Sequence, residues 1–289
     1  MAEATERGRV RGAGGRGKQR RQRGAWSRCK SEAGEPEEGV PEVAMDWREF
    51  RARLVARETE SEGQTEPASA AFPSDSRNIE TWAHSLGAPE GGCILVAKPV
   101  DFGSQSYFNY SVILVLEHTS SGSVGLLLNQ PDGRSIGEIA GAGEPFHGSE
   151  HPLWFGGDVG SHSDTLVLHP TFDPSAIEIL PSIYLSNVDE CQQLIDQCKL
   201  GQSDMRIMVG YCGWAPNQLE QECSAGAWWP CACSSSVIFS GSENFSKIDY
   251  WRDVIKLCGG DVLAEAEQRT GGLDQLTGES SDHDSSSSS

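Results

Sequence analysis

The sequence predicts an α+β protein in which residues 91–271 form one domain built on a mixed β-sheet. Short apolar runs typical of strands and amphipathic segments typical of helices follow one another without the strict alternation of a parallel sheet. The runs are continuously apolar, which indicates strands that are buried on both faces. We therefore expect layers of structure on each side of the sheet.

Charge divides the 289-residue chain into segments. Residues 1–30 hold ten Lys/Arg and two Glu, a net charge of +8, whereas residues 31–90 hold five basic and fourteen acidic residues, or −9. Residues 91–272 hold eight basic and twenty-two acidic residues, or −14, and residues 273–289 add −4. We expect a leader and linker over 1–44, a helical extension over 45–90, the core over 91–271 and a disordered acidic, Ser-rich tail over 272–289.

The leader is Arg-rich and almost free of acidic residues after Glu6. This composition is typical of an organelle transit peptide. A basic tail that contacts nucleic acid and a tail without fixed structure are the alternatives. No apolar run of the chain approaches the ~18–20 residues of a membrane span, so we expect none.

Two segments between the leader and the core have helical spacing. In Met45–Glu58 the apolar residues recur at i, i+3, i+7 and i+8, and Asp46 is placed to cap the helix. We expect this helix to dock on the core, with binding to a partner as the alternative. Asn78–Leu86 repeats the pattern in a shorter form.

The core is expected to hold several strands and two long helices. The segments Ser111–His118 and Ser123–Asn129 are joined by four residues, which predicts a β-hairpin. Residues 132–152 are rich in glycine and acidic residues and are expected to form a loop. Further strands are expected at Cys93–Ala97, Asp164–His169, Ala176–Leu180, Ile183–Ser186 and Ser236–Ser240, and helices at Asn187–Lys199 and Ser246–Cys258, the second ended by Gly259 and Gly260.

The stretch from Met205 to Glu222 predicts a strand, a tight turn and a helix. Met205–Tyr211 is apolar except for Arg206, Cys212–Gly213 interrupts it, and Ala215–Pro216 places proline at the first position of a helix, where its missing N–H costs nothing. Acidic side chains just past the helix start are favoured by the helix dipole.

Residues 208–222, MVGYCGWAPNQLEQE, resemble the Gly-Tyr-small-Gly-Trp-x-Pro-Gly-Gln-Leu-Glu signature of the YqgE/AlgH family. A second family motif is similar to Glu117-His118, Gly125-Leu126 and Asn129-Gln130-Pro131. The resemblance implies a mixed sheet curled toward a half-barrel, with helices packed on it. The segment before the core looks like the extension of plant and algal members, which implies import into the plastid (chloroplast), with the cytoplasm as the alternative.

The chain departs from the family pattern at three positions. Asn217 stands where glycine is usual, and asparagine tolerates left-handed backbone geometry better than branched residues do. Cys212 replaces a small Ala or Ser, so the family as a whole cannot depend on a thiol there. Asp158 stands where a proline is common, which leaves that turn less rigid.

The resemblance implies a surface that binds a ligand or a protein partner. Gln218 and Glu222, four residues apart on the helix, can share one face. The structural alternative is that such polar groups only hold the turn, and that a strand-end histidine only bonds to a backbone carbonyl. The residues expected at the surface are Tyr211, Trp214, Gln218, Glu220, Glu222, His118 and Asn129.

Catalytic motifs are missing from the sequence. It contains no Gly-x-Ser-x-Gly elbow, no His-Glu-x-x-His and no P-loop. The cysteines at 212, 223, 231 and 233 lack the spacing of a zinc site, so we expect reduced thiols and no metal or other cofactor. An active thiol at Cys212 would require a lowered pKa.

A non-enzymatic regulatory or interaction module that binds a protein or a small-molecule ligand is therefore the expected function. The first alternative is a transcriptional regulator, a label that some family members carry. The second is an unrecognised hydrolase or thiol enzyme. Direct DNA binding by the core is not expected, because affinity for a phosphate backbone comes mostly from Lys and Arg.

Overall fold

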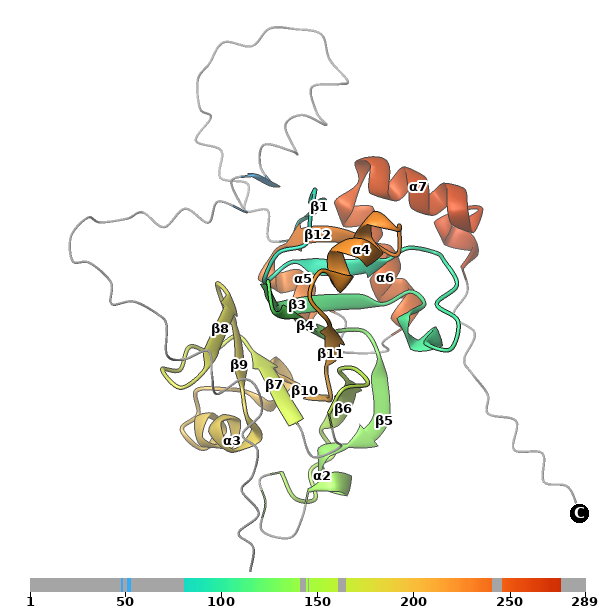
Figure 1. Cartoon of the computed structure of the whole chain (residues 1–289). Helices are drawn as coiled ribbons and strands as arrows, with labels where there is room; N and C mark the ends of the chain where they lie inside the picture. Colours follow the sequence, from blue (N-terminus) through green and yellow to red (C-terminus); the bar gives the residue numbers. More distant parts are fainter. Residues whose placement is uncertain are drawn as a thin grey trace, which may run out of the picture. The chain divides into compact units, whose positions relative to one another are not determined.

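The computed structural model describes residues 48, 51, 52, 81–140, 144, 146–160, 165–240 and 246–276, all within the compact unit Met45–Ser289. The predicted α+β class, with a mixed sheet and helices packed on sheets, is confirmed. The described strands form two six-stranded sheets (Figure 1).

The first sheet is antiparallel throughout, in the order β1-β12-β2-β3-β4-β11. All four residues of β2 are buried, so this strand is covered on both faces as predicted. The predicted hairpin is confirmed as β3 and β4. The strands are β1 (Ala83–Ser85), β2 (Ile94–Ala97), β3 (Val112–Thr119), β4 (Gly122–Leu127), β11 (Cys212–Trp214) and β12 (Trp228–Cys233).

The second sheet is mixed, in the order β5-β6-β10-β7-β9-β8. Only β6 and β10 run parallel to each other, and the other neighbours are antiparallel. The strands predicted over Ala176–Leu180 and Ile183–Ser186 are confirmed. The strands are β5 (Pro131–Ser135), β6 (Pro152–Phe155), β7 (Thr165–His169), β8 (Ile177–Leu180), β9 (Ile183–Ser186) and β10 (Arg206–Val209).

Two predicted helices are confirmed, and in the structure a side chain caps the start of each. The Asn187 side chain accepts a hydrogen bond from the backbone N–H of Glu190 at 2.8 Å, and the Ser246 hydroxyl accepts one from that of Asp249 at 3.2 Å. In the described part of the chain no helix is long and apolar enough to cross a membrane. The α-helices are α2 (Ile136–Ile139), α3 (Val188–Asp196), α4 (Gln218–Ser224), α5 (Ser235–Phe239), α6 (Lys247–Cys258) and α7 (Gly260–Thr270), and the 3-10 turns are η2 (Ser106–Phe108), η3 (Gln202–Asp204) and η4 (Leu273–Gln275).

Helices cover both faces of the first sheet, as the continuous apolar strands predicted. Successive side chains of a strand point to opposite faces. On β12, Trp228 donates its indole N–H to Glu222 of α4, and Trp229 donates its own to Glu265 of α7. The two helices therefore lie on opposite sides of β12, both beside the first sheet in Figure 1.

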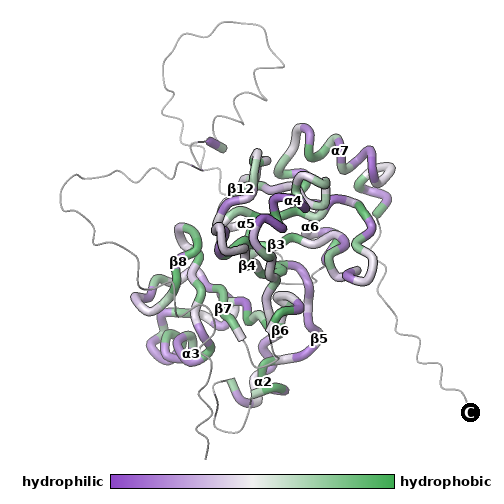
Figure 2. Tube along the Cα trace, viewed as in Figure 1, coloured by the Kyte–Doolittle hydropathy of each residue, from purple (hydrophilic) through white to green (hydrophobic). Residues whose placement is uncertain are grey.

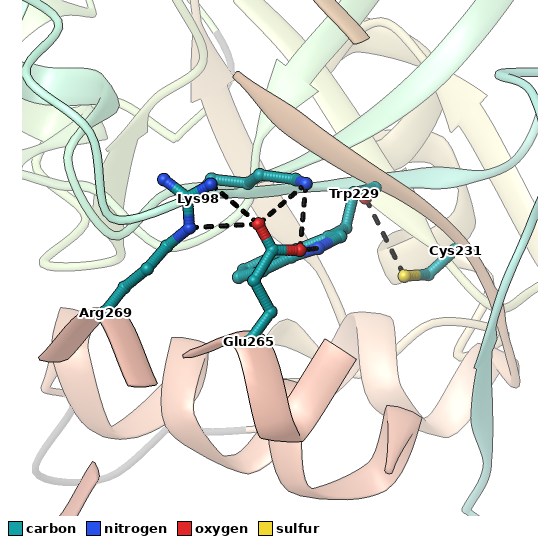
Figure 3. A network of polar contacts seen from close by, with 5 residues as sticks. All are labelled: Lys98, Trp229, Cys231, Glu265 and Arg269. Atoms are coloured by element: carbon teal, nitrogen blue, oxygen red, sulfur yellow. Dashed lines mark hydrogen bonds and ion pairs between the residues drawn. The ribbon is translucent and has the colours of Figure 1, made fainter. Parts of the chain in front are cut away.

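A network around Glu265 fixes α7 to the sheet (Figure 3). Its carboxylate accepts hydrogen bonds from Lys98 at 3.0 and 3.1 Å, from the Trp229 indole at 2.9 Å and from Arg269 at 2.9 Å. Burial alone would raise the pKa of Glu265, but the bonds from Lys98 and Trp229 leave this pKa below its ordinary value. Figure 2 shows hydrophobic and hydrophilic residues alternating along α7, as expected of a helix that packs through one face.

The chain passes from the second sheet to the first at Gly210, which has φ of 72°. Gly157 lies against this crossing with φ of 153°, and a Cβ added there would overlap the backbone of Tyr211. Across the same place, the N–H of Gly156 donates to Val209 at 2.8 Å and the N–H of Leu127 donates to Gly156 at 2.9 Å. Only glycine fits two backbones that approach so closely.

The predicted tight turn at Cys212–Gly213 is wrong. Both residues belong to β11, because the outer edge of β4 offers backbone partners to them, and the bend lies before them at Gly210. The prediction that the next helix begins at Ala215–Pro216 is also wrong, since α4 begins at Gln218. Asn217 precedes it in the left-handed conformation, φ 62°, which agrees with the expectation for asparagine at this position.

The helix predicted over Asn78–Leu86 is wrong for the residues that the structure describes. Ala83–Ser85 is strand β1, paired with β12, and residues 78–80 lie outside the described residues. The backbone N–H of Leu86 donates to Pro230 at 2.8 Å. Pairing with a strand about 150 residues away in sequence outweighs the weak local helical spacing.

Three smaller expectations are also corrected. Ser236–Ser240 was expected to be a strand but forms α5, because a short apolar run does not distinguish the two by periodicity. The expected loop over 132–152 contains most of β5 and all of α2, which begins with a capping box made by Ser135 and Glu138. Gly259 and Gly260 end α6 but do not end the helical region, since α7 begins at Gly260.

Of the predicted helix over 45–58 the structure describes Arg48, Arg51 and Ala52, which are helical. Ala52 is buried, and the Arg48 guanidinium donates to the Gly91 carbonyl at 2.7 Å and to Glu90 at 3.1 Å. This part of the helix therefore contacts the core, as predicted. The leader over 1–44 and residues 277–289 of the predicted tail lie outside the described residues.

We expect Gly157→Ala to lower the free energy of unfolding by at least ~2 kcal/mol, because alanine disfavours this φ and its methyl group would overlap the crossing. Gly87→Ala is the matched control, since a Cβ there meets nothing within 4 Å, and it should change the free energy by less than ~0.5 kcal/mol. Urea unfolding followed by circular dichroism measures both. Equal effects of the two substitutions would contradict this account of the crossing.

Candidate functional site

Glu222 of α4 is the centre of a compact polar arrangement. One carboxylate oxygen accepts the indole N–H of Trp214 at 2.9 Å and that of Trp228 at 2.8 Å, and the other accepts the side-chain amide of Gln218 at 2.8 Å. Glu222 is half-buried. Three neutral donors thus fix the orientation of the carboxylate without neutralising its charge.

Local sequence explains how these four residues meet. Gln218 and Glu222 are four residues apart on α4, which puts them on one face of the helix as predicted. Trp214 is the last residue of β11, and Trp228 is the first of β12. Leu219 of α4 is fully buried in the same hydrophobic cluster as both tryptophans, which holds the helix against the sheet.

A pocket of about 360 Å³ lies beside this arrangement. Four aromatic side chains line it, and the rings of Phe102 and Phe108 lie 5.1 and 5.4 Å from that of Trp228. The volume is at the lower end of the range of small-molecule sites. The lining residues are Phe102, Gln105, Phe108, Asp158, Val159, Cys212, Gly213, Trp214, Gln218, Glu222, Ala227 and Trp228.

Asp158 supplies a second carboxylate to the lining. It accepts a hydrogen bond from the Tyr107 hydroxyl at 2.8 Å, and that hydroxyl accepts one from the Gln105 amide at 3.1 Å. Burial and the hydrogen bond to Asp158 raise the pKa of Tyr107 to about 12, so the phenol stays a neutral donor at ordinary pH. At this position the chain therefore presents an exposed carboxylate.

The charges of Glu222 and Asp158 have no cationic partner among the ion pairs of the described residues. Glu265 is the contrasting case, because it also accepts a tryptophan indole N–H but is paired with Lys98 and Arg269. Each of the two glutamates accepts an indole N–H from β12, on opposite sides of the strand. Among the described residues, only Glu265 also pairs with cations.

Of the residues predicted for the surface, Trp214, Gln218 and Glu222 come together at the pocket. Glu220 and His118 lie near each other but do not line the pocket: the His118 imidazole is 3.6 Å from the Glu220 carboxylate and bonds to the Ser123 hydroxyl at 2.7 Å. His118 of β3 and Cys212 of β11 are not on neighbouring strands, because β4 lies between them.

The other two predicted residues hold backbone in place. Asn129 is fully buried, accepts from the N–H of Val112 at 2.8 Å and donates to the carbonyls of Tyr110 and Lys247 at 2.9 and 3.0 Å. Tyr211 is half-buried and forms a two-bond backbone bridge with Val159. The contacts of Asn129 and Tyr211 therefore agree with the alternative that these residues stabilise the backbone and do not bind a ligand.

Sequence reasoning missed most of the opposite wall of the pocket. Phe102, Gln105 and Phe108 lie in a segment without periodicity, and no signal in the sequence connects it to Glu222. Trp228 carried a usable signal, since two consecutive tryptophans before a proline are unusual in any chain. Asp158 stands out in the sequence as a departure from the family pattern, but nothing in the sequence predicts that it lines the same pocket as Glu222.

The pocket offers no activated nucleophile. Cys212 is buried, and its thiol donates to the Gly156 carbonyl at 3.4 Å. Burial and the nearby charge of Asp158 raise the pKa of this thiol, whereas a thiol nucleophile needs a lowered pKa. His169, the other histidine at a strand end, is fully buried and bonds to Ser186 at 3.0 Å, and burial lowers the pKa of its imidazole.

A larger hollow of about 970 Å³ lies beside α3 and residues 146–150. Polar side chains dominate its lining, and Phe146 is the only aromatic residue other than histidine in it. It therefore lacks the combination of aromatic walls and fixed polar groups found at Glu222, and the smaller pocket is the stronger candidate.

Most of the core is similar to known proteins. Residues 94–263 match the family model described as AlgH-like. A UPF0301 protein of Chlorobium phaeobacteroides is 32% identical over 174 residues, 58% of this chain and 88% of the relative, and one of Chlorobium limicola is 34% identical over 174 residues with the same coverage. The solution structure of the AlgH protein from Pseudomonas aeruginosa aligns with a TM-score of 0.45 and 24% identity, over 68% of this chain and 99% of that one.

We expect Cys212 to react with iodoacetamide at least ~100-fold more slowly than the exposed Cys198 at neutral pH, because burial raises the pKa of Cys212 and hides its sulfur. Peptide mass spectrometry after timed alkylation measures each site, and Cys198→Ser identifies the fast-reacting peptide. Rapid modification of Cys212 that is already half-maximal below about pH 7 would instead mark an activated thiol.

Proposed function

We propose, from the premise that the chain belongs to the AlgH-like family, that its core is a non-enzymatic regulatory module that binds a ligand in the pocket beside Glu222. One observation carries the proposal: Trp214, Trp228 and Gln218 hold the Glu222 carboxylate in a fixed orientation at the edge of an aromatic-lined pocket. Fixed polar groups in a largely apolar hollow are the usual features of a ligand site.

The arrangement supports recognition because its polar groups are oriented before any ligand arrives. Gln218 bonds to Glu222 and also accepts the backbone N–H of Ala215 at 2.9 Å, so its own side chain is fixed at both ends. Pre-oriented groups bind with a smaller loss of conformational freedom.

The contacts support binding over the catalytic alternative. A hydrolase or thiol enzyme needs a nucleophile next to a base, but Cys212 is buried with a raised pKa and has β4 between it and His118. The transcriptional alternative gains no specific observation either, since eight basic residues among twenty-two acidic ones over 91–272 form a poor surface for phosphate groups.

The composition of residues 1–30 supports a second part of the proposal, import into the plastid. Ten basic residues and no acidic residue after Glu6 give this segment the character of a transit peptide. The acidic core would then act in the organelle without its leader.

The first experiment is a ¹⁵N–¹H NMR screen of the ¹⁵N-labelled full chain against a library of cationic, neutral and anionic fragments. A pocket ligand should shift the indole signals of Trp214 and Trp228 and leave that of Trp229 unchanged, because Trp229 lies on the other side of β12. Trp214→Phe removes one hydrogen bond to Glu222 and should weaken binding about tenfold.

Asp253→Asn, an exposed substitution on α6, is the matched control and should leave the affinity unchanged. The proposal is wrong if fragments of all three charge classes leave the Trp214 and Trp228 signals in place.

For localisation, a fluorescent protein fused to residues 1–90 should accumulate in plastids when expressed in plant cells, because this fusion carries the Arg-rich leader. A fusion of residues 45–90, which lacks that leader, is the control and should stay outside. Microscopy that finds the longer fusion in the cytosol or the nucleus would end the plastid proposal.

A further inference from the structure

We infer that the pocket beside Glu222 binds a small organic cation with an ammonium head group, an inference that rests on the binding role proposed above. Two carboxylates, Glu222 and Asp158, line the same hollow as four aromatic rings. No lysine, arginine or histidine is among the lining residues. The ligand is therefore expected to supply the missing positive charge.

The strongest support comes from comparing Glu222 with Glu265, which lie on the two helices on either side of β12. Glu222 and Glu265 each accept an indole N–H, from Trp228 and Trp229. Glu265 is neutralised by Lys98, whose ammonium lies 3.0 Å from the carboxylate and 5.0 Å from the centre of the Trp229 ring. On one face of the strand the protein thus places an ammonium group against a carboxylate and a tryptophan.

The other face has the same pairing of carboxylate and tryptophan, and no described residue places an ammonium group there. The hydrogen bonds from Trp214, Trp228 and Gln218 replace part of the hydration that the half-buried Glu222 carboxylate loses, but these neutral donors supply no counter-charge. A bound cation would restore the balance that Lys98 provides at Glu265. Aromatic walls add attraction, because the negative faces of tryptophan and phenylalanine rings favour a nearby cation.

Charge also selects against other ligands. An anion would meet Glu222 and Asp158 at short range, and like charges in a partly enclosed site repel each other more strongly than in water. A neutral apolar ligand could contact Phe102 and Trp228 but would leave both carboxylates unpaired. The pocket volume of about 360 Å³ suits a head group or a small amine.

Choline and its neutral isostere 3,3-dimethylbutan-1-ol provide the test, because they share shape and hydroxyl group and differ in charge. Each is titrated into the full chain by calorimetry, with the indole NMR signals recorded in parallel. We expect choline to shift the Trp214 and Trp228 signals and to bind at least about tenfold more tightly than the isostere, from the charge–charge and cation–π attraction together.

Asp158→Asn should weaken choline binding about fivefold to tenfold without affecting folding, because Asp158 is exposed and asparagine can still accept the Tyr107 hydroxyl. Glu222→Gln should weaken it similarly while keeping an oxygen for the indoles. Asp253→Asn removes an exposed carboxylate on α6 and should change nothing. Circular dichroism verifies that each variant is folded.

Three results would overturn the inference. Equal affinity for choline and the isostere would leave the pocket as a ligand site but remove the role of charge. Choline binding that survives both Asp158→Asn and Glu222→Gln would place the cation elsewhere. Choline that shifts no pocket indole would also reject the inference, and the fragment screen, which includes neutral and anionic compounds, then decides separately whether the pocket binds anything.

Discussion

The close crossing of backbones at Gly157 and Gly210 is the constraint on which the rest of the structure depends. It lets the chain leave β10 in the second sheet and add β11 to the edge of the first sheet within three residues. The position of β11 sets the position of Trp214, and the turn after it places α4 over the sheet. A Cβ on either glycine would overlap the backbone of the opposite segment.

The strand β12 turns this scaffold into two polar centres of different character. Its adjacent tryptophans point to opposite faces, and each donates to a glutamate on a helix. On the α7 side, Lys98 and Arg269 both pair with Glu265 in a network that attaches the helix to the sheet (Figure 3). On the α4 side the carboxylate lines a pocket and has no partner among the ion pairs of the described residues, which is the difference between a structural contact and a candidate binding site.

Local patterns in the sequence allowed much of the fold to be predicted. The hairpin of β3 and β4 follows from two apolar runs and a short loop, and helices α3 and α6 follow from their amphipathic spacing. The pairing of Gln218 with Glu222 follows from helical spacing alone. Predictions failed where long-range pairing decided the outcome, as in β1 and β11, whose conformations depend on β12 and β4.

By itself, the amino-acid sequence determined the α+β class and the acidic core, because these depend on composition and on contacts within a few residues. Trp214, Gln218 and Glu222 were expected at a binding surface from the resemblance of residues 208–222 to a family signature. The tertiary structure alone decided that Phe102, Asp158 and Trp228, which lie far apart in the chain, meet at Glu222. It also decided which glutamate is neutralised. The physical reason is that charge balance depends on distance in space, and Lys98 reaches Glu265 across 167 residues of chain while no such cation reaches Glu222 within the part of the chain that the structure describes.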